Sequence, residues 1–177
     1  MTRKTIQTIQ NQKNKKKITC LTAYSSEIAK IVDEHVDITL IGDSLGTVIY
    51  GMKNTQGVTL EMMMEHGRAV SKKCKKSFTI IDMPYKTYEN NKQALTNVKK
   101  LLNYTKCQAI KIETDEKNIG LVRFLTKNKI KVASHIGVTP QKYKNFSKIR
   151  SLGKLPAEKD KIFNLAIKLE EAGTCLI

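Results

Sequence analysis

Three carboxylates in this sequence stand at the ends of short apolar runs. Asp43 and Asp82 each follow such a run, and Glu113 closes a third run in which Lys111 lies two residues earlier. Apolar runs without polar alternation are typical of parallel strands covered on both faces. If these runs are parallel strands of a barrel, their carboxyl ends meet at one mouth. The three acids then converge there with Lys111, which shares a strand face with Glu113.

Such a group of residues suggests a magnesium site. Carboxylate oxygens are hard ligands that suit Mg²⁺, whose octahedral shell leaves positions for water and a chelating substrate. Each residue also has a structural explanation, because an Asp after a strand often caps a helix or opens a turn. Lys111 and Glu113 could likewise form a structural ion pair. For one acid the two explanations weigh evenly, whereas three acids at three strand ends favour a functional site.

His135 ends the fifth apolar run and is expected to point into the same mouth. There it could bind a substrate carboxylate or a catalytic group. A lone histidine is more often a satisfied structural donor, so its functional interpretation is limited to a supporting role.

The elements that would position these residues alternate along the chain. The strand-like runs lie at residues 18–22, 38–42, 78–81, 109–112, 132–136 and 174–177. Between them, helical periodicity places apolar residues on one face, as in Leu60, Met63 and Met64 behind a Thr59 cap. An opening helix is expected from Thr5 to about residue 13. Alternating strands and helices predict a parallel sheet with right-handed crossovers.

This pattern fits an open doubly wound sheet or a (β/α)8 barrel. A dinucleotide-binding sheet would carry a glycine-rich fingerprint after the first strand, and Thr22-Ala23-Tyr24-Ser25 is not one. A complete barrel needs about 250 residues. The chain has 177 residues and contains five βα units plus the start of a sixth strand, so as a barrel it is incomplete. We expect a single domain over residues 1–177, with residues 1–16 forming an N-terminal helix or cap.

Composition limits the other classes of function. The 32 Lys and Arg residues outnumber the 16 Asp and Glu residues, but the lysines are scattered without interleaved aromatic residues. A lysine-biased surface therefore explains the charge of +16 better than nucleic-acid binding does. The chain lacks an apolar run long enough for a membrane span and a secretory signal, and its cysteines form no CxxC pair. We expect a cytoplasmic protein without a membrane or nucleic-acid partner.

Several motifs together resemble the ketopantoate hydroxymethyltransferase family. They occur in the family's order and at nearly its spacing over almost the whole chain. The motifs are Thr22-Ala23-Tyr24, Ile41-Gly42-Asp43-Ser44-Leu45-Gly46, Val58-Thr59, Asp82-Met83-Pro84, Lys111-Ile112-Glu113, His135-Ile136-Gly137-Val138-Thr139-Pro140-Gln141 and Leu169-Glu170-Glu171-Ala172-Gly173.

The resemblance implies a (β/α)8 TIM barrel of the phosphoenolpyruvate/pyruvate type, assembled as a homo-oligomer, usually a decamer. It implies that Asp43 and Asp82 ligate Mg²⁺ and that Glu113 holds the metal directly or through water. It also implies that Asp43, Ser44, Asp82 and Lys111 contact the substrate, 3-methyl-2-oxobutanoate. The one-carbon donor would be 5,10-methylenetetrahydrofolate and the product 2-dehydropantoate.

The sequence departs from the family at a few positions. Ser25 replaces an Asp, Gly57 replaces a Pro, and residues 146–148 replace a glycine-rich turn. The family's general-base glutamate would fall just beyond Ile177, so no catalytic base is expected within the chain. We therefore expect this chain by itself to have negligible turnover and to expose apolar sheet edges.

Three alternative functions remain open at this stage. The first is another Mg²⁺-dependent lyase or mutase of the same superfamily that acts on a 2-oxo or 2-hydroxy acid. The second is an inactive fragment that serves as a binding or assembly module. The third, nucleic-acid binding, would show steep salt dependence.

Overall fold

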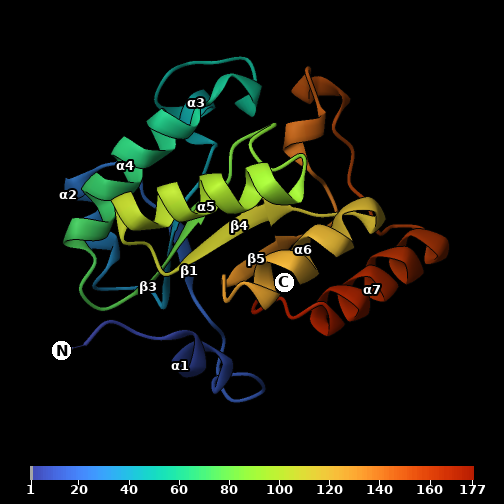
Figure 1. Cartoon of the computed structure of the whole chain (residues 1–177), viewed down its shortest axis with the longest axis horizontal. Helices are drawn as coiled ribbons and strands as arrows, with labels where there is room; N and C mark the ends of the chain where they lie inside the picture. The colour runs from blue at the N-terminus through green and yellow to red at the C-terminus, as the bar shows by residue number, and fades with distance from the viewer. Residues whose placement is uncertain (1) are drawn as a thin grey trace.

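The computed structural model describes residues 2–177 and has a five-stranded parallel sheet at its centre (Figure 1). The strands lie side by side in the order in which they occur along the chain. They are β1 (Cys20–Thr22), β2 (Ile38–Ile41), β3 (Phe78–Asp82), β4 (Ala109–Glu113) and β5 (Val132–His135).

The strand order decides between the two predicted architectures. In a doubly wound sheet the order reverses at a switch point, whereas in a barrel each strand pairs with its successor. The order β1-β2-β3-β4-β5 is that of a barrel. The expected start of a sixth strand is represented by one parallel bridge, between Ala133 and Leu176. Ser134 N–H donates to the Leu176 carbonyl at 2.9 Å, so this segment extends the same ladder.

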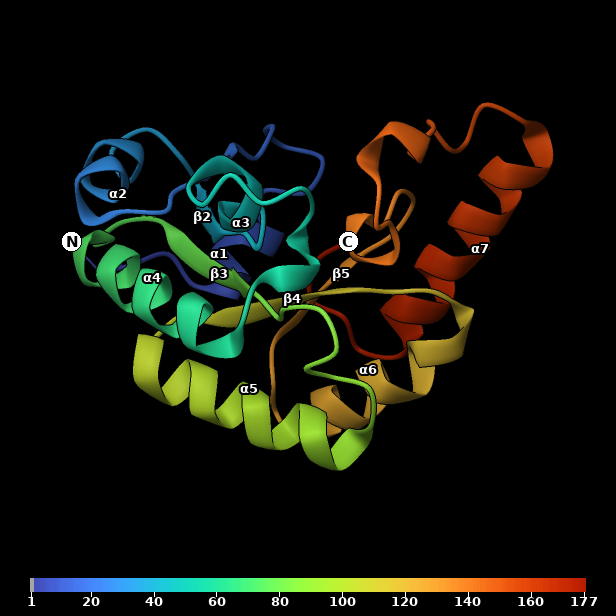
Figure 2. The same cartoon turned by 90° about the horizontal axis from the view of Figure 1, so that it is seen from above.

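The helices form an arc around one face of the sheet (Figure 2). The arc contains α2 (Ser26–Val32), α4 (Leu60–Lys73), α5 (Asn91–Thr105), α6 (Ile119–Lys127) and α7 (Pro156–Glu171), and the short α3 (Leu45–Val48) follows β2. Thr59 accepts a hydrogen bond from Met62 N–H and caps α4 as predicted. Ser25 caps α2 in the same way. Since Ser and Asp are both good N-caps, the departure at Ser25 preserves this local role.

Side chains on the two faces of the sheet belong to two separate apolar clusters. The outer face packs against the helices through Ile41, Ile81, Ile110, Ile112 and Val132. The inner face contributes Ile38, Phe78, Ile80, Ala109 and Ala133 to a second cluster. This alternation follows from the two-residue period of a strand. The same period places Asp82, Lys111 and His135, two residues after Ile80, Ala109 and Ala133, on the inner face as well.

The opening helix α1 (Ile6–Gln10) closes the lower end of the inner face. Ile9 is fully buried in the inner cluster, and α1 lies below the sheet in Figure 1, at the opposite end from α3. The helix is shorter than predicted, because turns follow Gln10 and Asn14 adopts a positive φ of 62°. Residues 1–16 were expected to form an N-terminal helix or cap. In the described part of this segment, α1 covers the inner apolar cluster.

The first strand is also shorter than predicted. It begins at Cys20 instead of residue 18 because Thr19 is held by Asp37, whose carboxylate accepts from Thr19 N–H at 3.0 Å. All three residues of β1 are exposed, and the Leu21 side chain is 54% exposed. The expected exposure of an apolar edge is thus confirmed for β1.

Within residues 2–177, no helix has both the length and the apolar character needed to cross a bilayer.

Helix α4 approaches α5 and the sheet most closely at Gly67. A Cβ atom there would lie 2.4 Å from Ile81 Cδ1 and 2.8 Å from Thr105 Cγ2, and both side chains are buried. Gly67→Ala should therefore lower the free energy of unfolding by about 1–3 kcal/mol, measured by urea denaturation. Gly120→Ala is the matched control, because a Cβ on Gly120 of α6 meets nothing within 4 Å. Equal stability of the two variants would contradict this packing.

Candidate active site

The carboxyl ends of β3, β4 and β5 bring four predicted site residues onto the inner face. In the parallel register Asp82 pairs with Lys111, and Glu113 pairs with His135. Lys111 Nζ lies 2.6 Å from Asp82 Oδ1, and the Asp82 side chain is only 4% exposed. Lys111 therefore pairs with Asp82 across neighbouring strands, not with Glu113 on its own strand.

Asp43 reaches the same mouth from the loop that follows β2. Its backbone N–H donates to Asp82 Oδ2 at 3.1 Å, and the residue is 8% exposed. Gly42 precedes it, and a Cβ on Gly42 would come within 2.8 Å of Ser44 Oγ. The glycine thus leaves room for the turn that brings Asp43 and Ser44 to the strand end.

Ser44 is held by a hydrogen bond to Tyr24, in the loop that follows β1. Its hydroxyl lies 2.8 Å from the Tyr24 hydroxyl. His66 on α4 bonds through Nδ1 to the Tyr24 carbonyl at 2.6 Å and through Nε2 to the Tyr50 hydroxyl at 2.9 Å. His66 therefore supports the Tyr24 backbone instead of joining the acids.

Gln141 connects the acids and was not assigned a role from the sequence. Its Nε2 donates to Asp43 Oδ2 at 2.7 Å, and its backbone N–H donates to both Glu113 oxygens at 3.1 and 3.2 Å. The Tyr88 hydroxyl donates to Gln141 Oε1. Gln141 ends one of the motifs quoted above, which is the only signal that could have drawn attention to it. Tyr88 carried no such signal.

Burial makes the charged forms of two acids unfavourable. It raises the pKa of Asp43 to about 6, and the neighbouring Asp82 carboxylate adds to the rise. Burial also raises the pKa of Glu113 to about 7, against the opposing effect of the Gln141 N–H. Burial alone would lower the pKa of Lys111, but the adjacent Asp82 outweighs it and the pKa is raised. The mouth therefore holds three acids against one lysine and favours a bound cation.

His135 stands at the end of β5, as expected, and is half-buried. Burial lowers the pKa of its imidazole, and the charge of Lys111 lowers it further. Its Nδ1 atom is buried without a hydrogen-bond partner in the described structure. A hydrogen bond between the ring and the Val138 backbone opposes the fall in pKa, so a structural role and a supporting role both stay predictions.

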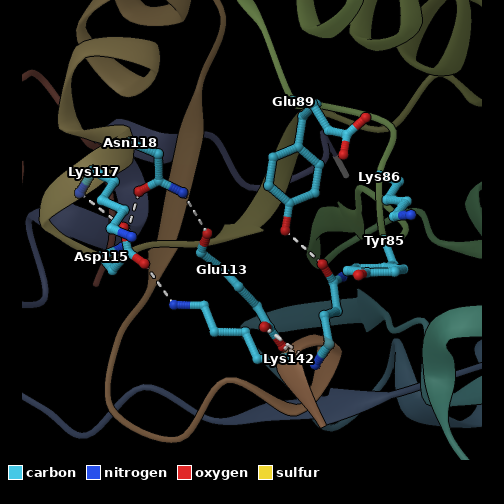
Figure 3. Close-up of a pocket in the computed structure, with 10 residues that line it drawn as sticks. Tyr85, Lys86, Glu89, Glu113, Asp115, Lys117, Asn118 and Lys142 are labelled. Carbon is cyan, nitrogen blue, oxygen red and sulfur yellow. Dashed lines mark hydrogen bonds and ion pairs between the residues drawn. The ribbon is translucent and has the colours of Figure 1, made fainter. Parts of the chain in front are cut away.

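A cavity of about 470 Å³ adjoins Glu113 (Figure 3). Glu113 and Gln141 form its inner wall, and the rest of the lining comes from the loops after β3, β4 and β5. At its rim Lys142 pairs with Asp115 at 2.6 Å, and Figure 3 shows this pair on one side of Glu113, with Tyr85, Lys86 and Glu89 on the other. A ligand in this cavity would lie directly beside Glu113.

The donor atoms fit Mg²⁺ bound by two carboxylates. Within residues 2–177, no three His, Cys, Asp or Glu side chains stand close enough to hold a metal ion by themselves. Both Glu113 oxygens are engaged by the Gln141 N–H. Mg²⁺ commonly keeps several waters and uses only one or two carboxylates. Asp43 and Asp82 would therefore bind directly, and Glu113 through water. The buried Asp82 Oδ1 also lacks a well-directed hydrogen bond despite its contact with Lys111.

Solved structures place the fold in a known class. Phosphonopyruvate hydrolase, solved with oxalate and Mg²⁺, matches 98% of this chain and 61% of its own with a TM-score of 0.71 at 15% identity. The 2,3-dimethylmalate lyase of the PEP mutase/isocitrate lyase superfamily matches 96% of this chain and 59% of its own with a TM-score of 0.66 at 12% identity. These likenesses confirm the predicted fold, an incomplete (β/α)8 barrel.

Sequence comparison is more specific. The profile of ketopantoate hydroxymethyltransferase matches residues 3–177. The 3-methyl-2-oxobutanoate hydroxymethyltransferase of Pelagibacter ubique is 49% identical over 92% of this chain, and that of Agrobacterium fabrum is 41% identical over 99%. The chain therefore belongs to the ketopantoate hydroxymethyltransferase family. It spans 62% and 63% of the length of these two relatives.

The raised pKa values predict a specific dependence of stability on pH. Since Asp43 and Glu113 titrate near 6 and 7 when folded but at 3.8 and 4.5 ordinarily, the folded chain keeps protons that the unfolded chain releases. The free energy of unfolding therefore falls as pH rises through this window. Asp43→Asn should reduce the fall between about pH 4 and 6, measured by urea denaturation with a chelator present.

His135 acts with the opposite sign in the same window, because its lowered pKa makes the unfolded chain the stronger proton binder. Since His135 is present in both parent and variant, its contribution cancels in the difference between their slopes of unfolding free energy against pH. Asp160→Asn, at an exposed acid of α7, is the control and should keep the parent slope. A parent slope in Asp43→Asn as well would contradict the raised pKa of Asp43.

Proposed function

We propose that this chain forms the substrate- and metal-binding part of a 3-methyl-2-oxobutanoate hydroxymethyltransferase. The observation that carries the proposal is the convergence of Asp43, Asp82, Lys111 and Glu113 at the carboxyl ends of adjacent strands. In barrels this end is where active sites lie. Family membership supports the choice of reaction among those that such a site could perform.

The substrate, 3-methyl-2-oxobutanoate, has a carboxylate and a keto oxygen that together can chelate one cation. Bound between Asp43 and Asp82, Mg²⁺ would act as a Lewis acid that polarises the keto group. The oxalate and Mg²⁺ complex of phosphonopyruvate hydrolase supports this choice, since oxalate also presents two neighbouring oxygens. Lys111 offsets negative charge that gathers at the keto oxygen, while Ser44 and His135 supply donors to the substrate oxygens.

The overall reaction joins C3 of the substrate to the methylene carbon of 5,10-methylenetetrahydrofolate. C3 loses a proton, the new C–C bond forms, the bonds from the methylene carbon to the folate nitrogens break, and water supplies the hydroxyl group. The products are 2-dehydropantoate and tetrahydrofolate. The cavity lined by Glu113 and Gln141 would take the donor, since both residues connect it to the proposed metal site. A cytoplasmic homo-oligomer without nucleic-acid or membrane partners belongs to the same proposal.

A second candidate is another Mg²⁺-dependent lyase or mutase that acts on a 2-oxo acid. The fold likeness to phosphonopyruvate hydrolase and 2,3-dimethylmalate lyase favours it. A substrate screen separates the two candidates, because a lyase would cleave a 2-oxo or 2-hydroxy acid without any folate. An inactive binding or assembly module is the remaining alternative.

The test is turnover of 3-methyl-2-oxobutanoate with 5,10-methylenetetrahydrofolate and Mg²⁺. We expect negligible turnover from this chain alone and turnover from a version extended with the C-terminal part of a relative. In the extended protein, Asp82→Asn should lower kcat/KM by about 100-fold or more, because Lys111 and the cation both lose a charged partner. Glu61→Gln removes an exposed acid paired with Lys100 and should leave the rate unchanged.

Two results would contradict the proposal. Turnover of an unrelated 2-oxo acid without folate would favour the lyase. No turnover of any substrate by a folded, extended protein would favour the binding module.

A further inference from the structure

Every polar atom of the buried Gln141 side chain forms a hydrogen bond. The residue is 4% exposed. Its Nε2 donates to Asp43 Oδ2 at 2.7 Å and to the Met83 carbonyl at 2.9 Å, and its Oε1 accepts from the Tyr88 hydroxyl. The two donors of the amide thus meet two acceptors, and its oxygen meets a donor.

This arrangement permits only one orientation of the amide. If the group were reversed, Oε1 would face the Asp43 carboxylate and the Met83 carbonyl, and all three are acceptors. In the orientation set by these two acceptors, Oε1 accepts from the Tyr88 hydroxyl. Its phenol remains protonated, since burial raises the pKa of Tyr88 and the nearby Glu113 raises it further.

The backbone of Gln141 engages a second acid and a second loop. Its N–H donates to both oxygens of Glu113, and its carbonyl accepts from Gln56 Nε2 at 2.8 Å. Pro140 precedes it in the turn η3 (Pro140–Lys142) and restricts the backbone there. Asn54 joins the same two loops again by donating to the Lys144 carbonyl at 2.8 Å. Gln141 therefore links residues from three different strand ends.

We propose that Gln141 is a positioning residue that sets the geometry of cation binding at the mouth. By holding one oxygen of Asp43, its amide fixes the direction in which the other oxygen points. By holding Glu113, its backbone keeps that carboxylate at the distance of a water-mediated ligand. The inference rests on the proposed metal site and adds a residue that neither binds the cation nor reacts.

A role in packing alone makes a different prediction. Methionine has nearly the length and volume of glutamine, so Gln141→Met keeps the packing and the backbone bonds to Glu113 and Gln56. It removes only the side-chain hydrogen bonds. Tyr88→Phe is a second, milder variant, because it removes only the hydroxyl that donates to Oε1 of the amide.

The experiment uses Mn²⁺ as the probe on the 177-residue chain, with electron paramagnetic resonance reporting both affinity and the environment of the bound ion. We expect Gln141→Met to weaken binding about tenfold, as loss of a hydrogen bond to a charged group implies, and to change the spectrum of the bound ion. Tyr88→Phe should weaken binding about threefold. Gln7→Met, at an exposed glutamine of α1, is the matched control and should bind like the parent. Circular dichroism and Tm establish folding.

Each outcome decides the proposal. Weaker binding and an altered spectrum in folded Gln141→Met support it, and if that variant does not fold, Tyr88→Phe decides. Parent-like affinity and spectrum in the folded variants would overturn the positioning role and leave the proposed function standing. Absence of saturable Mn²⁺ binding in the parent would overturn the metal site, and the positioning role with it.

Discussion

Asp82 pairs with Lys111, and Glu113 with His135, in the parallel register of β3, β4 and β5. This register decides which charges share the inner face. A slip of one residue in β4 would turn Lys111 and Glu113 toward the outer apolar layer, where nothing could compensate them. The packing of Phe78, Ile80 and Ala109 over α1 prevents the slip, because these residues must fill the inner cluster. The lower core of the half-barrel thus fixes the chemistry of its mouth.

The same register leaves three acids at the mouth with one lysine, so other residues must stabilise the remaining negative charge. Lys111 compensates one of three acids, and the pKa values of Asp43 and Glu113 rise in response to burial. Gln141 supplies neutral donors that hold both acids without removing their charge. A neutral donor keeps the site attractive to a cation, whereas a second lysine would occupy the cation's place. The stability lost to uncompensated charge is the cost of a site arranged for binding.

Much of this arrangement could be predicted from sequence, because it depends on local pattern. The apolar runs placed Asp82, Glu113 and His135 at strand ends, and the two-residue period of a strand put Lys111 on the same face as Glu113. The motifs, including the one around Asp43 and Ser44, indicated the family. Gln141 could not be assigned, since its partners Met83 and Asp43 lie 58 and 98 residues away. The choice of Asp82 as the partner of Lys111 likewise depends on strand register, which no local signal reports. Only tertiary structure showed that both Glu113 oxygens accept from the Gln141 N–H.

The most direct test of the account is a crystal structure of this chain with Mn²⁺ and 3-methyl-2-oxobutanoate, with the ion located by its anomalous scattering. We expect one ion at about 2.1–2.2 Å from oxygens of Asp43 and Asp82. A water should lie between the ion and Glu113, and the 2-oxo acid should complete the coordination shell. An ion bound elsewhere, or a 2-oxo acid that lies away from Lys111, would contradict it.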